Sequence, residues 1–389
     1  MLSDVNTYAA AGEQVCNILQ KAEIAVSCYT FSQKNLEPDE VGVGSAVMHY
    51  DTSCDMIVAV GSGVINDIGK ILSNLTGKPY MIVGTAPSMD GYASASSSMT
   101  RDGLKISLPS RSADVIIGDT DILCRAPLQM MKAGLGDMLA KYVSICEWRI
   151  SHLITGEYYC EEVAELIRSA LKRCTDNAAG LLLRNEQAVQ AVFEGLVIGG
   201  VAMNYAGLSR PASGVEHYIS HVLDMRSVEF GTKVDLHGIQ CAIGTLIAAG
   251  MYEKLKKVTP QKERALLHAQ AFDYVEYQKS LRKLLGKGAE SMIALEAKEG
   301  KYNAAVHAER LEIILRNWEK ILQIIDEEIP NAECLSALMD MIDAPKTLKE
   351  IGIEEDLLPD IFRATKDIRD KYVLSRLAWD LGIENELLT

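Results

Sequence analysis

Short apolar runs alternate with helix-forming segments over the first third of the chain. Ala25–Phe31, Met56–Val60, Tyr80–Val83 and Val115–Ile117 have the composition of strands. Ile65–Leu75 lies between two of these runs, and glycines just before it predict that a helix begins there. Strands that alternate with helices are typical of a parallel α/β sheet, so we predict such a sheet here.

Beyond Pro127 the strand signals stop, and apolar residues recur every three to four positions. One stripe comprises Val163, Leu166, Ile167, Ala170, Leu171 and Cys174, and another comprises Leu311, Ile314, Leu315, Trp318, Ile321, Leu322 and Ile325. We interpret both stripes as core, and we expect the Lys- and Glu-rich segment Leu255–Tyr302 to be solvated helix and turn. The pattern predicts two domains, an α/β domain over 1–126 and an all-helical domain over 127–389.

Composition narrows the class of protein. The chain has 389 residues, of which 48% are hydrophobic and 24% charged, as in ordinary globular proteins. Its net charge of −14 argues against an extended nucleic-acid surface, although a small anionic substrate remains compatible with it. No apolar run approaches the ~18 residues of a membrane helix, and residues 1–20 do not resemble a signal peptide. The nine cysteines are an odd number without a CxxC pair, and no export signal is visible, so we expect a reduced, cytoplasmic protein. Because no apolar run is long enough, we expect no membrane insertion.

A glycine turn follows the apolar run Met56–Val60, in the segment Val58–Asp67. Gly61-Ser62-Gly63 allows a tight turn and a close approach of the backbone to a phosphate, and the start of the next helix favours negative charge. The spacing differs from G-x-G-x-x-G. These residues alone leave two interpretations open, a nucleotide site and an ordinary strand–helix turn.

The segment Gly84–Ser94 follows the next strand and offers hydroxyl groups, backbone donors and the carboxylate of Asp90. A polar loop after a strand is common and needs no function. At the carboxyl edge of a parallel sheet, however, such loops are where ligands bind.

One aspartate and three histidines carry the candidate metal chemistry. Asp137 lies in Gly134–Lys141, His217 and His221 lie one helical turn apart after Ser209–Glu216, and His237 opens His237-Gly238-Ile239-Gln240. One carboxylate and two imidazoles can hold a divalent cation and leave positions open for a substrate oxygen. The i,i+4 spacing of His217 and His221 does not by itself make both of them ligands.

Together these segments resemble the sn-glycerol-1-phosphate dehydrogenases, within the metal-dependent glycerol dehydrogenase and dehydroquinate synthase superfamily. The matching segments are Gly61–Lys70, Gly84–Ser94, Gly134–Tyr142, Ser209–His221 and His237–Gln240, and Thr365–Tyr372 resembles the bacterial branch. The resemblance spans nearly the whole chain.

The resemblance implies a dehydroquinate synthase-like fold, in which the α/β domain over 1–126 binds the nucleotide and the all-helical domain over 127–389 binds metal and substrate. It also assigns roles to individual residues. Asp137, His217 and His237 would bind the metal, which would be nickel, zinc or iron, and Asp90, Asp137 and His221 would contact substrate. The residues expected to contact NAD or NADP are Asp4, Gly61, Ser62, Gly63, Val64, Ile65, Thr85, Ala86, Pro87, Ser88 and Ser94. A carboxylate at Asp4 can accept from a ribose 2′-hydroxyl and would repel a 2′-phosphate, which favours NAD.

Two features depart from the family pattern. Ser62 stands where the family turn more often has glycine, and only three residues precede Asp4, where the family has a longer strand. We therefore expect the first strand to be truncated, either because the gene start is misplaced or because the protein lacks that strand, and NADH binding to be weak.

The resemblance implies reversible, NAD(P)H-linked reduction of dihydroxyacetone phosphate to sn-glycerol 1-phosphate, a step of phospholipid biosynthesis, by a cytoplasmic homodimer. Arg210 and Lys141 are candidates for binding the substrate phosphate by their proximity in sequence, since both lie within the matching segments. Three alternatives remain: a glycerol or other polyol dehydrogenase, a cyclase of the dehydroquinate synthase type, and a catalytically silent homologue.

Overall fold

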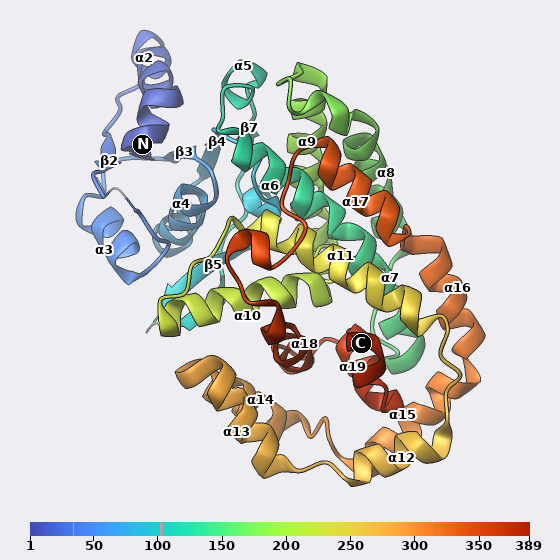
Figure 1. The fold of residues 1–389 in the computed structure, drawn as a ribbon. Coiled ribbons are helices and arrows are strands. Elements are labelled where there is room, and N and C mark those ends of the chain that lie inside the picture. Colours follow the sequence, from blue (N-terminus) through green and yellow to red (C-terminus); the bar gives the residue numbers. More distant parts are fainter. Residues whose placement is uncertain (34, 102–103) are drawn as a thin grey trace. The chain divides into compact units, whose positions relative to one another are not determined.

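A computed structural model describes residues 1–33, 35–101 and 104–389, in which the last strand ends at Ile117 and every later element is a helix (Figure 1). The expected order, an α/β start followed by helices, is confirmed. Contacts divide the chain into two compact units, Met1–Met138 with Glu165–Leu208 and Leu139–Ala164 with Ser209–Thr389. The expected domain boundary near residue 126 stays a prediction; it lies close to the point where strands give way to helices.

A five-stranded parallel sheet organises the first unit. Its strands are β1 (Leu2–Asp4), β2 (Tyr29–Phe31), β3 (Ile57–Gly61), β4 (Tyr80–Gly84) and β7 (Val115–Ile117), in the spatial order β2-β1-β3-β4-β7. The central strands β3 and β4 are largely buried, which explains their nearly continuous apolar sequences. On both sides of β1 the neighbouring strand comes later in the sequence, β2 on one side and β3 on the other. The strand order therefore reverses at β1.

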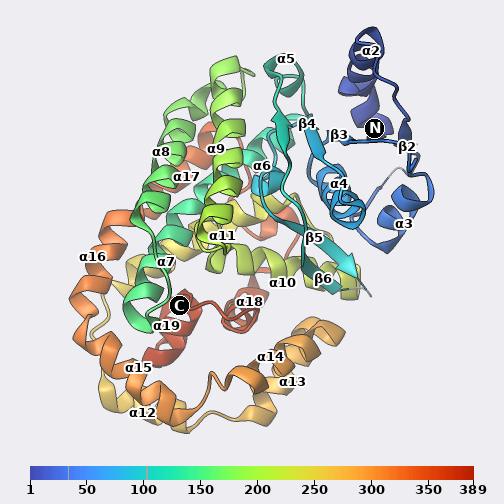
Figure 2. The same cartoon turned by 180° about the vertical axis from the view of Figure 1, so that it is seen from behind.

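Three of the four expected strands agree with the structure to within one residue at each end, and the fourth, Ala25–Phe31, is reduced to β2. The first strand, which was expected to be truncated, is the three-residue β1. The antiparallel hairpin of β5 (Ser96–Arg101) and β6 (Leu104–Pro109) was not expected, because it begins with three serines, which carry no apolar alternation (Figure 2).

Helices complete the first unit. They are α1 (Val5–Thr7), the π-helical η1 (Tyr8–Gly12), α2 (Glu13–Lys21), α3 (Glu40–Met48), α4 (Gly63–Thr76), the 3₁₀ turn η2 (Asp90–Tyr92), α5 (Thr120–Leu123), α6 (Leu128–Leu139), most of α8 (Glu161–Asn177), η3 (Ala178–Gly180) and α9 (Glu186–Ala206). The expected helix over Ile65–Leu75 corresponds to α4, which ends because Gly77 adopts a left-handed φ of 69°.

By length and composition alone, α9 could cross a membrane, and among the described helices it is the one with this property. More than half of its apolar window, 56%, is buried inside the protein. Phe193 of α9 packs so closely on β4 that a Cβ at Gly84 would lie 2.8 Å from its ring. We therefore interpret α9 as a core helix of the first unit.

Helices make up the second unit: α7 (Lys141–Thr155), α10 (Val215–Phe230), α11 (His237–Leu255), α12 (Lys262–Gln270), α13 (Tyr274–Leu285), η4 (Gly286–Gly288), α14 (Ala289–Glu299), α15 (Ala304–Arg316), α16 (Trp318–Glu328), α17 (Ala332–Met341), η5 (Lys349–Ile351), η6 (Glu355–Leu357), α18 (Leu358–Thr365), α19 (Leu374–Leu381) and α20 (Glu384–Leu388). One apolar core joins α7, α10, α11, α15, α16 and the C-terminal helices. The stripe that begins at Leu311 runs over α15 and α16 and contributes to this core. The other stripe lies on α8, and there Leu166 is an exception to the expected core, because 37% of its surface is exposed.

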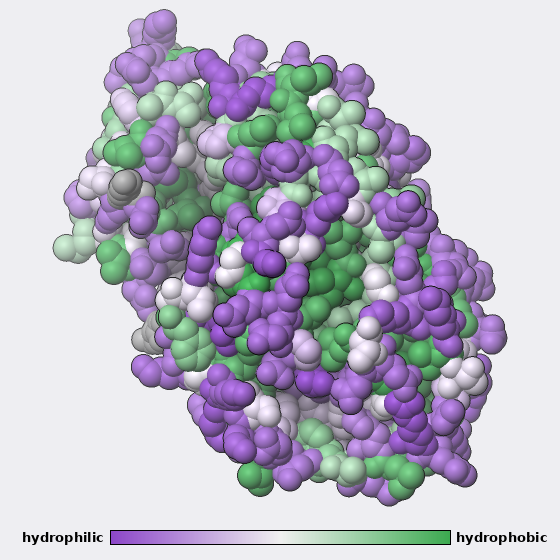
Figure 3. Space-filling view, viewed as in Figure 1, coloured by the Kyte–Doolittle hydropathy of each residue, from purple (hydrophilic) through white to green (hydrophobic). Residues whose placement is uncertain are grey.

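The Lys- and Glu-rich segment Leu255–Tyr302 is only partly solvated as expected. The surface over α12 and α13 is predominantly hydrophilic in the view drawn (Figure 3). Leu281, Leu284 and Leu285 of α13 are nevertheless buried, so this helix also has a core-facing side.

Candidate functional site

The residues expected to bind the cofactor gather at one edge of the sheet in the first unit. Gly61 and Gly84 are the last residues of β3 and β4 and lie in register, and Leu2 of the parallel β1 pairs with Ala59. Asp4, Gly61 and Gly84 therefore end their strands at the same edge, beside the reversal of strand order. Open α/β sheets bind their ligands at this position.

Gly61 makes the turn into α4 possible. A Cβ there would lie 2.5 Å from Cβ of Ile65, whereas the nearest atom to a Cβ at Gly63 is 3.5 Å away. Ser62 is the N-cap residue of α4, but its side chain makes no capping hydrogen bond. The first N–H groups of α4 thus form a helix N-terminus of the kind that binds phosphate.

Asp4 ends β1 and caps the helix that follows. Its Oδ1 accepts hydrogen bonds from the N–H groups of Asn6, at 2.8 Å, and Thr7, at 2.9 Å. A three-residue strand thus leads into Asp4 and pairs with both β2 and β3. Because both capping bonds use Oδ1, the second carboxylate oxygen can accept another donor.

Lys70 organises the loop that contains the other expected cofactor residues. Its buried ammonium donates to the carbonyls of Gly91, at 3.0 Å, and Ser96, at 2.5 Å, and to the hydroxyl of Ser94, at 3.2 Å. Ser94 is 5% exposed, and its hydroxyl is used within this network. The structure thus gives Lys70 and Ser94 a clear part in shaping the loop.

Close packing joins the loop after β4 to α6, the helix that carries Asp137. A Cβ at Gly134 would lie 1.8 Å from the carbonyl oxygen of Pro87, so α6 can lie here only with glycine at that position. The loop residues Thr85, Ala86 and Ser88 are all less than 9% exposed.

Two residues expected to contact substrate meet at this packing. The Asp90 N–H donates to Oδ2 of Asp137 over 2.9 Å, and Asp137 is fully buried. Asn204 of α9 holds the same loop, donating to the carbonyl of Ala93 and accepting from the N–H of Ala95. Asp90 and Asp137, 47 residues apart in sequence, are thus held together.

The three candidate histidines gather in the second unit, on α10 and α11. The ring centroids of His217 and His237 are 5.1 Å apart, and those of His221 and His237 are 6.1 Å apart. These two helices pack along each other, because a Cβ at Gly244 of α11 would lie 2.7 Å from the carbonyl oxygen of Glu216.

Polar partners orient two of the imidazole rings. Nδ1 of His217 lies 2.8 Å from Oε1 of the buried Glu216, and Nδ1 of His237 lies 3.0 Å from Oγ of Ser220. Since an ionised carboxylate only accepts, His217 donates from Nδ1 and keeps the lone pair on Nε2. This arrangement, in which the second ring nitrogen is held by a carboxylate or hydroxyl, is usual for histidines that bind a metal.

Cys241 is a further candidate ligand that sequence reasoning missed. Each of His217, His237 and Cys241 offers a ligand atom, and these atoms lie within 4.8 Å of one another. Burial alone would raise the pKa of the Cys241 thiol, but the imidazoles of His217 and His237 lower it overall. The sequence signal that could have identified Cys241 is its position one helical turn after His237. Donors of this kind and spacing fit a borderline divalent cation such as zinc or nickel.

A buried carboxylate fixes the start of α10, just before His217. Glu147 accepts hydrogen bonds from the N–H groups of Val215, at 2.9 Å, and Leu374, at 2.8 Å, which are the first residues of α10 and α19. Burial raises the pKa of Glu147 to about 8, and the charge of Glu216 raises it as well.

The C-terminal segment that resembles the bacterial branch also supports α10. Lys371 donates to the carbonyl of Ser213, at 3.0 Å, and to its hydroxyl, at 2.7 Å, two residues before the helix begins. Burial, together with the nearby charges of Arg210 and Arg369, lowers the pKa of Lys371 to about 7.

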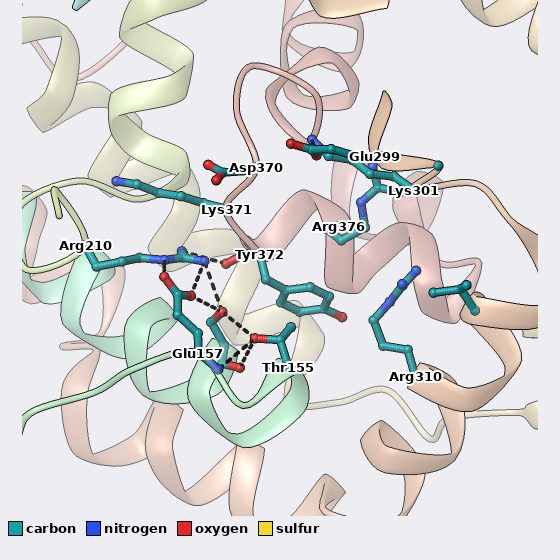
Figure 4. A pocket seen from close by; sticks show the side chains of 13 residues that line it. Thr155, Glu157, Arg210, Glu299, Lys301, Arg310, Asp370, Lys371, Tyr372 and Arg376 are labelled. Atoms are coloured by element: carbon teal, nitrogen blue, oxygen red, sulfur yellow. Dashed lines mark hydrogen bonds and ion pairs between the residues drawn. The ribbon is translucent and has the colours of Figure 1, made fainter. Parts of the chain in front are cut away.

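Arg210 and Lys141, the candidates for binding the substrate phosphate, are both 1% exposed. Arg210 lines a cavity of about 410 Å³ in the second unit, where its guanidinium is bonded to Glu157, Ser151 and the carbonyl of Tyr372 (Figure 4). Lys141 donates to the carbonyl of Ala212. These partners give both residues structural roles, and we assign neither of them to the phosphate.

Comparison with known proteins agrees with these observations. Residues 1–127 match the family model described as iron-containing alcohol dehydrogenase. A Halalkalibacterium halodurans protein named glycerol-1-phosphate dehydrogenase [NAD(P)+] is 36% identical over 263 residues, 66% of each chain. A Bacillus licheniformis protein of the same name is 26% identical over 390 residues, all of this chain and 84% of the relative.

Among solved structures, the glycerol dehydrogenase of Schizosaccharomyces pombe has a TM-score of 0.63 at 16% identity, covering all of this chain and 82% of that one. A 1,3-propanediol oxidoreductase has a TM-score of 0.61 at 16% identity, covering 99% of this chain and 91% of that one. Both show that the fold is shared. The sequence relatives show that the chain belongs to the family of the glycerol-1-phosphate dehydrogenases.

Proposed function

We propose that this protein catalyses the reversible, NAD(P)H-linked reduction of dihydroxyacetone phosphate to sn-glycerol 1-phosphate. The observation that carries the proposal is the histidine pair on α10 and α11, whose Nδ1 atoms are both held by neighbouring side chains. The names of the sequence relatives support the substrate and the reaction.

The metal ligands that we propose are His217 and His237, with Asp137 as the third ligand assigned by family resemblance. Zinc, nickel and iron all suit one carboxylate and two imidazoles. When bound, the cation supplies a Lewis acid for the ketone oxygen, and NAD(P)H supplies the hydride. Glu216 and Ser220 keep the two rings oriented for this task.

The cofactor would lie along the carboxyl edge of the sheet. The start of α4 offers backbone N–H groups to its pyrophosphate, and the Gly61 turn brings the backbone close to it. Asp4 would accept a hydrogen bond from a ribose hydroxyl, which supports NAD as the preferred cofactor.

Asp90 and His221 would act on the substrate. His221 lies one turn beyond His217 on α10 and could orient the substrate or relay a proton at an imidazole nitrogen. Asp90→Ala and His221→Ala should therefore keep metal and NADH binding while kcat/KM falls, by roughly 10²–10⁴-fold if His221 transfers a proton. Wild-type kinetics in either variant would remove that residue from the proposal.

The decisive experiment measures NADH oxidation with dihydroxyacetone phosphate and with dihydroxyacetone, and NAD+ reduction with glycerol, before and after chelation and metal add-back. We expect activity only with the phosphorylated ketone, lost on chelation and restored by zinc or nickel. Equal activity without the phosphate would indicate a polyol dehydrogenase. Release of inorganic phosphate from an added sugar phosphate without net NADH change would indicate a cyclase, and metal binding without NADH binding a silent homologue.

A homodimer, a cytoplasmic location and a role in phospholipid biosynthesis remain part of the proposal. Sedimentation of the purified chain tests the dimer, and metal analysis of protein purified without chelators tests which cation it carries.

A further inference from the structure

Two cysteines of the first unit lie close together although no disulfide joins them. Cys16 is on α2 and Cys28 directly precedes β2, and their sulfur atoms are 3.6 Å apart. Cys28 is exposed and Cys16 is nearly buried, with 9% of its surface accessible. A reagent in solution can therefore reach the sulfur of Cys28, whereas the sulfur of Cys16 is largely shielded from solvent.

We propose that Cys16 and Cys28 form a reversible dithiol–disulfide site, which takes a low-molecular-weight disulfide as its oxidant. This site is separate from the proposed dehydrogenase chemistry, since neither cysteine is among the metal, cofactor or substrate residues.

The exchange would take place in two balanced steps. The Cys28 thiolate attacks one sulfur of the small disulfide, forms a mixed disulfide and releases one small thiol. The Cys16 thiolate then attacks the Cys28 sulfur, closes the protein disulfide and releases the second small thiol. Two protein thiols are oxidised, and one small disulfide is reduced to two thiols.

The local geometry allows the bridge to close. A disulfide needs sulfur atoms about 2.05 Å apart, so the two atoms must approach by about 1.5 Å. Ala22–Cys28 connects the two cysteines without helix or strand, and most of it is exposed. Partial burial raises the pKa of Cys28, and its hydrogen bond with Cys16 raises it further, so exchange needs excess oxidant at neutral pH.

The bridge would join α2, the last helix of one helical run, to the residue that directly precedes β2. Helical residues continue from Val5, directly after Asp4, through α1, η1 and α2 to Lys21. β2, which follows Cys28, pairs with β1. Closing the bridge would therefore restrain both the helical run that follows Asp4 and the strand β2 that pairs with β1.

The test exposes the full-length protein to excess oxidised glutathione and maps its disulfides by mass spectrometry. Trypsin cuts after Lys21, between the two cysteines, so a bridge holds two separate peptides together. We expect this linked pair, a loss of two titratable thiols out of nine, and full recovery with dithiothreitol. The matched control is Cys334→Ser, which removes another exposed cysteine and should leave the bridge intact.

The single variants separate the two steps. In Cys16→Ser the reaction should stop at a stable glutathione adduct on Cys28, and in Cys28→Ser the linked peptides should be absent. A stable adduct on wild-type Cys28 without a bridge, a bridge to another cysteine, or no loss of thiols would each overturn the proposal.

Discussion

The two clusters of candidate residues are built from different parts of the polypeptide. At the sheet edge of the first unit, the backbone forms the site: strand ends, glycine turns and the start of a helix. On α10 and α11 of the second unit, side chains form it, and other side chains hold them in place. An added Cβ should therefore damage the first cluster, whereas loss of a ring or of its partner should damage the second.

The sharpest test of this difference removes one imidazole. His237→Ala should lose metal affinity by more than about 100-fold, with most of the activity, because few donors are left to hold the cation. NADH affinity should stay unchanged, since the sheet edge does not depend on this ring. Asp137→Asn and His217→Ala should behave alike. Metal analysis and NADH fluorescence titration measure the two effects.

His221→Ala is the matched control, since its ring stacks beside His237 but is assigned to substrate. It should keep its metal. Full metal content in His237→Ala would remove that residue from the proposed ligands.

A weaker change tests the partners of the rings. Glu216→Gln keeps the volume of the side chain but removes the charge that holds Nδ1 of His217. Metal affinity should fall roughly 10–100-fold, as for other carboxylates behind metal-bound histidines. Ser220→Ala, which removes a neutral partner, should cost less. If Glu216→Gln binds metal as tightly as the wild type, the carboxylate does not orient the ring.

Adding one methyl group tests the backbone site. In Gly61→Ala the new Cβ would lie 2.5 Å from that of Ile65, so the turn must shift, at a cost of about 1–3 kcal/mol in the free energy of unfolding. NADH affinity should fall while metal content stays full. Gly44→Ala, with no heavy atom within 4 Å of its Cβ, is the control and should change neither NADH affinity nor metal content. Normal NADH binding by Gly61→Ala would mean that this turn does not shape the cofactor site.

The last test concerns the pH dependence of stability. Burial raises the pKa of Glu147 from 4.5 to about 8, so the folded protein holds a proton that the unfolded chain releases. The free energy of unfolding should therefore be highest below pH 4.5 with respect to this group, and should decline as the pH rises from 4.5 to 8. Urea unfolding at several pH values measures this decline, and Glu147→Gln should reduce it. An unchanged slope in Glu147→Gln would assign the pH dependence to other groups.

Local sequence patterns determined a large part of the fold. β3, β4 and β7 were predicted to within one residue at each end, because an apolar run and a glycine or polar boundary are both short-range signals. The change from strands to helices was equally readable. The serine-rich β5 escaped prediction, because a polar strand carries too little apolar pattern, and the three-residue β1 was expected only from the family resemblance, as a truncated strand.

The residue types suited to metal and cofactor binding were also visible in the sequence, since imidazoles, carboxylates and glycine turns that occur together indicate such a site. The spatial neighbours of these residues were not visible in the sequence. The bond between the Asp90 N–H and Asp137, the place of Cys241 beside two imidazoles, the enclosure of Arg210 and the approach of Cys16 to Cys28 appear only in the tertiary structure. Periodicity and capping act within a few residues, whereas the partner of a side chain depends on which distant segments the packed core brings beside it.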